Sequence, residues 1–129
     1  MKINDPEVVA EVTAAFERYE TALMANDVAT LNELFWDSPH TLRYGVWENL
    51  YGHAAIAAYR GSVPGGAPQR VNGRTEITTF GHDFAVVNRE FERIGTGQAG
   101  RQSQTWVHLP EGWRIVAAHV SVKPPPVSA

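Results

Sequence analysis

Two polar side chains stand where the surrounding pattern predicts an apolar residue. Tyr19 continues a stripe of apolar residues at helical spacing, so its hydroxyl would reach an apolar interior and need a partner there. Arg43 lies in a short extended segment, flanked by Leu42 and Tyr44. A buried guanidinium is costly unless an anion meets it, and its planar fork matches a carboxylate. The pair indicates a carboxylate-binding site; the alternatives are a core tyrosine and an arginine that is exposed or paired with an internal glutamate.

Other side chains could contribute to such a site. His119 lies on a predicted strand, shares a face with Trp113, and is either a core histidine or a pocket wall. Glu90 shares a strand face with Glu92 and is either a general base or part of a solvated charged face. Arg60, at the end of a predicted helix, is a further possible anion contact. The aromatic residues that could wall a small cavity are Trp36, Trp47, Tyr51, Tyr59 and Trp106.

Some motif-like features do not support their usual functions. Residues 95–100 match the dinucleotide-binding pattern G-x-G-x-x-G, but an alternating strand follows where that pattern needs a helix, so a hairpin loop is predicted. The five histidines show no pair spaced for a helical zinc site, and the chain has no cysteine. We therefore expect no metal and no cofactor. No nucleophile elbow is present, which argues against acyl-enzyme hydrolysis.

Sequence periodicity predicts the elements that position these residues. Asp5 as N-cap, Pro6 at the first helical position and apolar residues every three or four positions predict a helix over 6–25. A second helix, capped by Asp27, should end near Trp36. Two short strands are expected within 41–51, a short helix over 53–60, and longer strands near 69–80, 84–94, 101–109 and 113–122, where the apolar period changes to two.

Helices followed by a strand meander predict an α+β fold, in which helices close one face of a curved, mostly antiparallel sheet and enclose a pocket. The 129 residues are expected to form one domain, with 123–129 as a proline-rich tail. Apolar residues make up 43% of the chain and charged residues 19%, which favours a packed core over disorder. A net charge of −3 with scattered basic residues argues against a nucleic-acid partner, and the lack of an apolar N-terminal run argues against a membrane span. A cytoplasmic protein is expected.

The order of elements and several segments resemble the SnoaL-like branch of the NTF2-like (cystatin-like cone) superfamily over about residues 5–123. The segments that carry the resemblance are 27–35 (DVATLNELF), 50–56 (LYGHAAI) and 112–121 (GWRIVAAHVS). Within them, 41–45 (TLRYG) followed by 48–52 (ENLYG) is similar to the AtzH-like proteins, small companions of amidase genes in nitrogen-compound catabolism.

These resemblances imply a fold and an activity. The superfamily implies a six-stranded curved sheet around a pocket and frequent homodimers through the outer face of the sheet, but no single activity. The AtzH-like resemblance implies cofactor-independent decarboxylation of 1,3-dicarboxyurea in cyanuric acid degradation, with a catalytic tyrosine and arginine that match Tyr19 and Arg43. The expected substrate contacts are Trp47, Tyr51, Tyr59, Glu90, Trp106 and His119.

In this hypothesis Arg43 holds a carboxylate, Tyr19 hydrogen-bonds or protonates the departing group, and aromatic walls exclude water. One alternative is an isomerase or hydrolase that uses Glu90 or His119 as its base on a larger neutral substrate. Another is a module without catalytic activity that binds a small acid or accompanies an amidase. This second alternative predicts that a carboxylate of the protein itself binds Arg43 and leaves no N–H donor of the guanidinium free.

Overall fold

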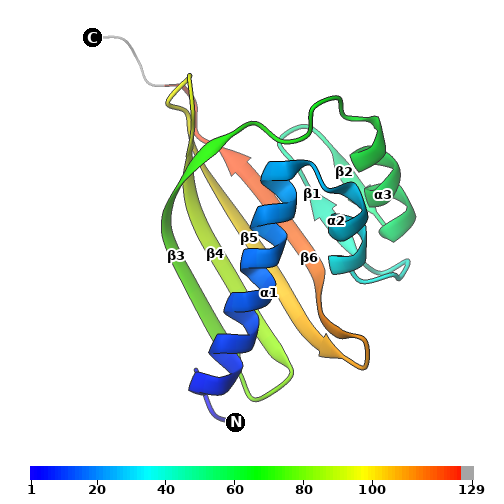
Figure 1. The fold of residues 1–129 in the computed structure, drawn as a ribbon, viewed down its shortest axis with the longest axis vertical. Coiled ribbons are helices and arrows are strands. Elements are labelled where there is room, and N and C mark those ends of the chain that lie inside the picture. The colour runs from blue at the N-terminus through cyan, green and yellow to red at the C-terminus, as the bar shows by residue number, and fades with distance from the viewer. Residues whose placement is uncertain (126–129) are drawn as a thin grey trace.

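Three helices and six strands make up residues 1–125, the part of the chain that the computed structural model describes (Figure 1). The helices are α1 (Pro6–Ala25), α2 (Val28–Leu34) and α3 (His53–Ser62). The strands are β1 (Leu42–Tyr44), β2 (Asn49–Tyr51), β3 (Arg70–Phe80), β4 (Phe84–Arg93), β5 (Ala99–Leu109) and β6 (Gly112–Val122). They form one sheet in the order β2-β1-β6-β5-β4-β3. The predicted α+β fold with a curved, mostly antiparallel sheet is confirmed.

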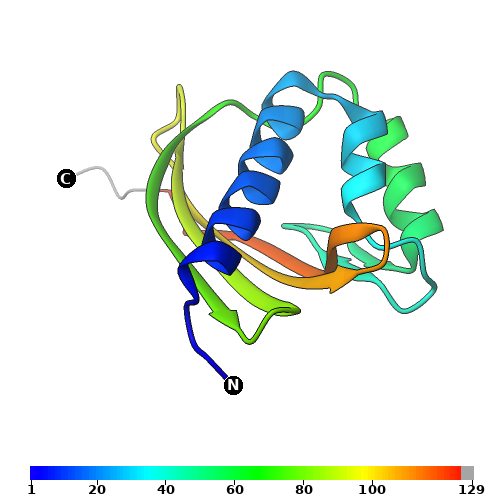
Figure 2. The same ribbon diagram turned by 60° about the horizontal axis from the view of Figure 1, so that its bottom comes forward.

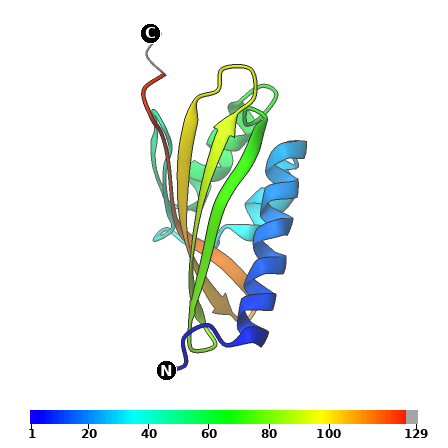
Figure 3. The same ribbon diagram turned by 90° about the vertical axis from the view of Figure 1, so that its left-hand side faces the viewer.

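Helix α1 begins and ends where its capping residues dictate. The Asp5 carboxylate accepts a hydrogen bond from the backbone N–H of Glu7, and Pro6 stands in the first turn. Asn26 adopts the left-handed conformation and closes the C-terminus. The helix lies along one face of the sheet (Figure 3) and buries a stripe that includes Phe16 and Tyr19 against it.

Strands β3 to β6 form an antiparallel meander, as the period-two pattern predicts. Strand β1 follows the two N-terminal helices and pairs in parallel with β6, while β2 folds back on β1 as the edge strand. The sheet curves around α1, and α2 and α3 pack together beside its β1 and β2 end (Figure 2). No helix within the described residues is long and apolar enough to cross a bilayer.

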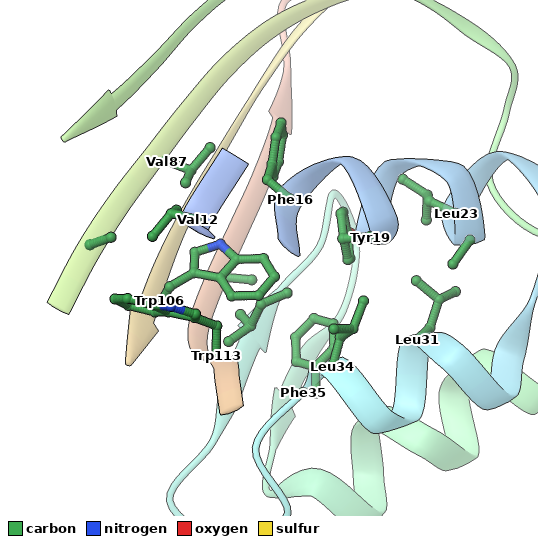
Figure 4. Close-up of a cluster of buried hydrophobic side chains, with 14 of the residues drawn as sticks. Val12, Phe16, Tyr19, Leu23, Leu31, Leu34, Phe35, Val87, Trp106 and Trp113 are labelled. Atoms are coloured by element: carbon green, nitrogen blue, oxygen red, sulfur yellow. The ribbon is translucent and has the colours of Figure 1, made fainter. Parts of the chain in front are cut away.

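The hydrophobic core lies between the helices and the concave face of the sheet (Figure 4). Its largest fully buried side chains are Trp106 on β5, Phe16 on α1 and Phe35, just after α2. Burial of such aromatic side chains stabilises the fold by about 1.5–3 kcal/mol each. The core fixes α1 and α2 against the sheet and leaves a cavity at the end that α3 covers.

Element ends differ from the predictions by one or two residues. Helix α2 ends at Leu34 because Phe35 is already extended and forms a parallel bridge to Ile115 of β6. Helix α3 continues through Gly61 to Ser62, whose hydroxyl donates to the carbonyl of Tyr59. Of the predicted tail, residues 123–125 follow β6 without regular structure, and 126–129 lie outside the described residues.

Candidate functional site

A cavity of about 190 Å³ opens between α1, α3 and the sheet. Its wall includes Tyr19 from α1, Arg43 from β1, Tyr59 and Arg60 from α3, and Ala118 from β6. The two residues that stood out in the sequence therefore face one enclosed space, although they lie on different elements. The volume suits a ligand of a few heavy atoms rather than a large ring system.

Tyr19 contributes an unpaired hydroxyl to this cavity. The side chain is 4% exposed, and its ring contacts the rings of Phe16 and Phe35, each with a centroid distance of 6.3 Å. Figure 4 shows the ring between α1 and the side chains contributed by α2 and Phe35. Tyr19 borders the cavity, and none of the hydrogen bonds between residues 1–125 involves its hydroxyl, so the hydroxyl is available to a ligand.

Arg43 already has a carboxylate partner. Its Nη1 donates to Oε1 of Glu48 at 2.7 Å, and its guanidinium lies 5.7 Å from the centre of the Tyr59 ring. The two charged side chains are 13% and 17% exposed. The predicted alternative of an internal salt bridge to a glutamate is thus realised, but inside the cavity that Tyr19 also lines. Within residues 1–125 the Arg43 guanidinium donates only this hydrogen bond, from Nη1, which leaves Nε and Nη2 for a ligand.

A tight turn brings Glu48 to this position. The N–H of Gly45 donates to the carbonyl of Glu48 at 2.9 Å and closes the loop between β1 and β2. The Glu48 carboxylate occupies the space that a Cβ on residue 45 would need, so a larger residue there would displace this carboxylate from its place beside Arg43. The close approach of the Glu48 carboxylate therefore explains why glycine stands at position 45.

The pKa values of Glu48 and Tyr59 depend on the charged groups beside them. Burial by itself would raise the pKa of the Glu48 carboxyl, but the hydrogen bond and positive charge of Arg43 outweigh burial and leave that pKa lowered. Burial, followed by the negative charge of Glu48, raises the pKa of the Tyr59 hydroxyl. At neutral pH the group is therefore an ionised Arg43–Glu48 pair beside a neutral phenol.

The cavity is rich in arginine. Four guanidinium groups line it, from Arg43, Arg60, Arg70 and Arg93, against one carboxylate within the described chain, that of Glu48. The charge of Arg70 is neutralised by Glu20 of α1, which does not itself line the cavity. The Glu20 carboxylate also accepts a hydrogen bond from the side-chain amide of Gln102 at 2.5 Å. This positive surplus lies inside a protein of net charge −3, so the site favours an anion.

The other predicted contacts divide into two groups. Trp47, Tyr59 and His119 line the cavity, Trp47 at 94% exposure on the loop between β1 and β2. The remaining three, Tyr51, Glu90 and Trp106, do not line this cavity. Tyr51 is 62% exposed and bonds the Tyr44 hydroxyl; Trp106 is packed into the core; and Glu90 lies on the solvated outer face of the sheet.

A β-bulge corrects the predicted environment of His119. Trp106 pairs with Ile115, but Thr105 pairs with Ala117, so Val116 is an extra residue on β6. The alternation shifts there by one: Ile115 and Ala118 are buried, whereas His119 is exposed. His119 therefore does not share a face with Trp113, and its ring packs edge-on against Tyr44 with a centroid distance of 5.6 Å.

Sequence reasoning missed Glu48 and Glu20 as structural partners of the arginines. A glycine three residues before Glu48 was the available signal for the first, and the position of Glu20 beside the buried Tyr19 was the signal for the second.

Among residues 1–125, no group of three or more histidine, aspartate and glutamate side chains is arranged to hold a metal ion.

The fold and the cavity together define an NTF2-like, cystatin-like domain. A structure of an NTF2-like protein of unknown function from Pseudomonas putida superposes with a TM-score of 0.77 at 14% identity, covering 91% of this chain and 87% of that one. At that identity the likeness concerns the fold alone. Domains of this class bind small molecules or catalyse their reactions.

Within this class of fold, the chain can be assigned to one family. A comparison with protein families matches the AtzH-like family over residues 1–125, and this chain belongs to that family. A protein of unknown function from Pectobacterium atrosepticum is 56% identical (TM-score 0.91, 95% of each chain covered). A cystatin-like fold protein from Burkholderia xenovorans is 49% identical (TM-score 0.92, 98% of this chain and 99% of that one covered). A search of curated proteins found no match.

Proposed function

We propose that this protein is a cofactor-independent decarboxylase of a small N-carboxylated urea, such as 1,3-dicarboxyurea, in cyanuric acid or ureide nitrogen catabolism. The proposal rests above all on one small cavity that is lined by Tyr19 together with a surplus of arginine. Membership of the AtzH-like family supports the same reaction. Within nitrogen catabolism, an amidase that releases N-carboxylated ureas would supply the substrate.

The chemistry requires a proton at nitrogen. In a carbamate, the C–N bond breaks as the nitrogen gains a proton; the bonding electrons stay on nitrogen, and the carboxylate leaves as CO₂. Arg43 binds a substrate carboxylate through the N–H groups that Glu48 leaves free, and Tyr19 donates the proton to the departing nitrogen. Water entering the cavity then returns a proton to the phenolate, so each CO₂ released consumes one proton.

Apolar wall atoms assist this step. Leu23, Leu31 and Ala118 line the cavity beside the charged groups. A carboxylate next to such a wall loses part of its hydration, and decarboxylation replaces it with neutral CO₂. The Arg43–Glu48 pair holds the guanidinium in a fixed position, so little reorganisation is needed when the substrate binds.

The direct test is to incubate the purified protein with enzymatically generated 1,3-dicarboxyurea and follow the appearance of CO₂ and urea. Arg43→Ala should lower kcat/KM by about 100-fold or more because it removes a charge-assisted anchor. Tyr19→Phe keeps the ring packing and should cause a similar loss, mainly in kcat, because it removes the proton donor.

Arg18→Gln is the matched control, since Arg18 pairs with Glu33 on the exposed surface of α1 and α2. It should retain wild-type turnover. Full activity in Arg43→Ala would end the assignment, and an unchanged kcat/KM in Tyr19→Phe would remove Tyr19 from the chemistry. Circular dichroism of each variant establishes that the fold is intact.

A second candidate function is a small-acid-binding or amidase-companion module without turnover. The observation that favours it is the Arg43–Glu48 salt bridge, in which a carboxylate of the protein already occupies part of the guanidinium. Binding of dicarboxylates without any release of CO₂ would support this function. An isomerase or hydrolase that depends on Glu90 or His119 has no such support, because both side chains are exposed.

A further inference from the structure

Arg60 is a cation without a counter-ion. Its Nε and Nη2 atoms are buried and have no hydrogen-bond partner, and no carboxylate within residues 1–125 lies within 4.0 Å of its guanidinium. The group lies 5.6 Å from the centre of the Phe35 ring and lines the same cavity as Tyr19 and Arg43. A largely buried guanidinium without a counter-ion is costly, so an anion bound in the cavity that Arg60 lines would offset that cost.

The charges in the cavity indicate how many acceptors are missing. Arg43 is paired with Glu48, and Arg70 with Glu20. Arg60 has no such partner, and Arg93 bonds a neutral acceptor, the side-chain oxygen of Gln98. The cavity wall therefore carries more guanidinium groups than carboxylates within the described residues, and Arg60 is one that no carboxylate meets, which matches an anionic ligand.

Arg60 is also near the proposed reaction centre. The Phe35 ring contacts the Tyr19 ring from one side, with a centroid distance of 6.3 Å, and the Arg60 guanidinium from another. Tyr19 and Arg60 therefore pack against the same aromatic ring, and both line the cavity. Arg43 lies against a different ring, that of Tyr59, so the two arginines approach the cavity from separate positions.

We propose that Arg60 binds a second carboxylate and makes the site selective for dicarboxylates over monocarboxylates of the same length. This inference deepens the proposed function and rests on it for the identity of the natural substrate. The competing explanation is that Arg60 serves only α3, through the negative end of the helix dipole and its contact with Phe35.

Calorimetric titration separates these explanations without any turnover. Glutarate has the five-atom backbone of a dicarboxyurea and does not lose CO₂, and its monoamide has the same shape with one charge fewer. The wild type should bind glutarate about tenfold or more tightly than the monoamide, because a charge-assisted contact contributes roughly that factor. Arg60→Gln should abolish that preference and leave binding of the monoamide within about twofold.

Arg60→Lys should keep part of the preference, and Arg18→Gln should keep all of it. Equal weakening of both ligands in Arg60→Gln, or no weakening of either, would overturn the proposal, as would failure of the wild type to bind glutarate below about 10 mM. A thermal unfolding curve for Arg60→Gln checks that the variant is folded.

The assay on 1,3-dicarboxyurea distinguishes this inference from the proposed function. If glutarate binding depends on Arg60 but no CO₂ is released from dicarboxyurea, the second carboxylate contact stands and the decarboxylase proposal fails. If dicarboxyurea is decarboxylated and kcat/KM is unchanged in Arg60→Gln, the decarboxylase proposal stands and the role of Arg60 fails.

Discussion

Tyr19 and Arg43 show how far single residues can be interpreted from sequence. Each was unusual because a polar group interrupted an apolar pattern, and the structure places both on one cavity. An internal glutamate was one of the alternatives for Arg43, but Glu48 was not singled out, because its approach depends on a turn that sequence spacing does not specify. The missing partner of Arg60 is a property of the whole packed interior, so no local pattern could reveal it.

The lowered pKa of Glu48 leads to a prediction about stability and pH. A carboxyl whose pKa is lower in the folded state stabilises the protein above its unfolded pKa, here about 4.5, and loses that contribution as the pH falls through the folded value. Glu48→Gln should therefore lower the free energy of unfolding by about 1 kcal/mol or more at pH 7, and by less at pH 3.

Urea unfolding of the wild type and Glu48→Gln at both pH values measures this difference. Because other acidic groups are common to the two proteins, their effects cancel in the comparison to a first approximation. A difference that is the same at pH 3 and pH 7 would show that the Arg43–Glu48 pair has no net ionic contribution.

At the scale of helices and strands, the features that could be predicted were those set by neighbouring residues, such as helix caps, strand alternation and turns. The bounds of α1 follow from its caps and agree with the structure, and the meander β3 to β6 follows from its alternation and turns. The parallel pairing of β1 with β6 and the bulge at Val116 depend on contacts between distant segments. That one extra residue reversed the predicted face of His119, because strand alternation carries a shift forward to the strand end.

Glu20 joins α1 to the sheet, which gives a second prediction. Its carboxylate accepts two contacts from Arg70, at 2.7 and 2.6 Å, and the side chains of this pair are 10% and 5% exposed. Glu20→Gln leaves Arg70 buried without its counter-charge and should lower the free energy of unfolding by about 3 kcal/mol.

The matched control is Glu33→Gln, because the Arg18–Glu33 pair joins two helices at about half exposure and should contribute less than about 1 kcal/mol. Equilibrium urea unfolding at pH 7 measures both variants. A loss in Glu20→Gln no greater than in Glu33→Gln would contradict an essential role for the Glu20–Arg70 pair.

At the scale of the whole molecule, the two faces of the sheet have different tasks. The helices cover one face, while the other presents charged and polar side chains around a shallow hollow whose lining includes Arg74, Glu76, Asn88, Glu90, Arg101 and Ser103. We propose that this outer face forms the homodimer interface that the family resemblance implies. The residue singled out as a possible base, Glu90, would then act in assembly rather than in chemistry.

Sedimentation equilibrium tests the dimer. The wild type should have twice the mass of one chain at micromolar concentration, and Arg101→Glu should weaken association by about tenfold, because it places a second negative charge opposite Glu90 across β4 and β5. Arg18→Glu, on the helical side, should not change the mass. A wild type that sediments as a single chain would contradict the proposal.

The exposed indole of Trp47 has a practical consequence. Trp106 and Trp113 are almost fully buried, whereas Trp47 borders the cavity at 94% exposure. Fluorescence from its ring is therefore sensitive to solvent in a way that the two buried indoles are not. A ligand bound in the cavity should therefore change the emission of Trp47, which can be measured without attaching a dye, over a background from the partly exposed Trp36.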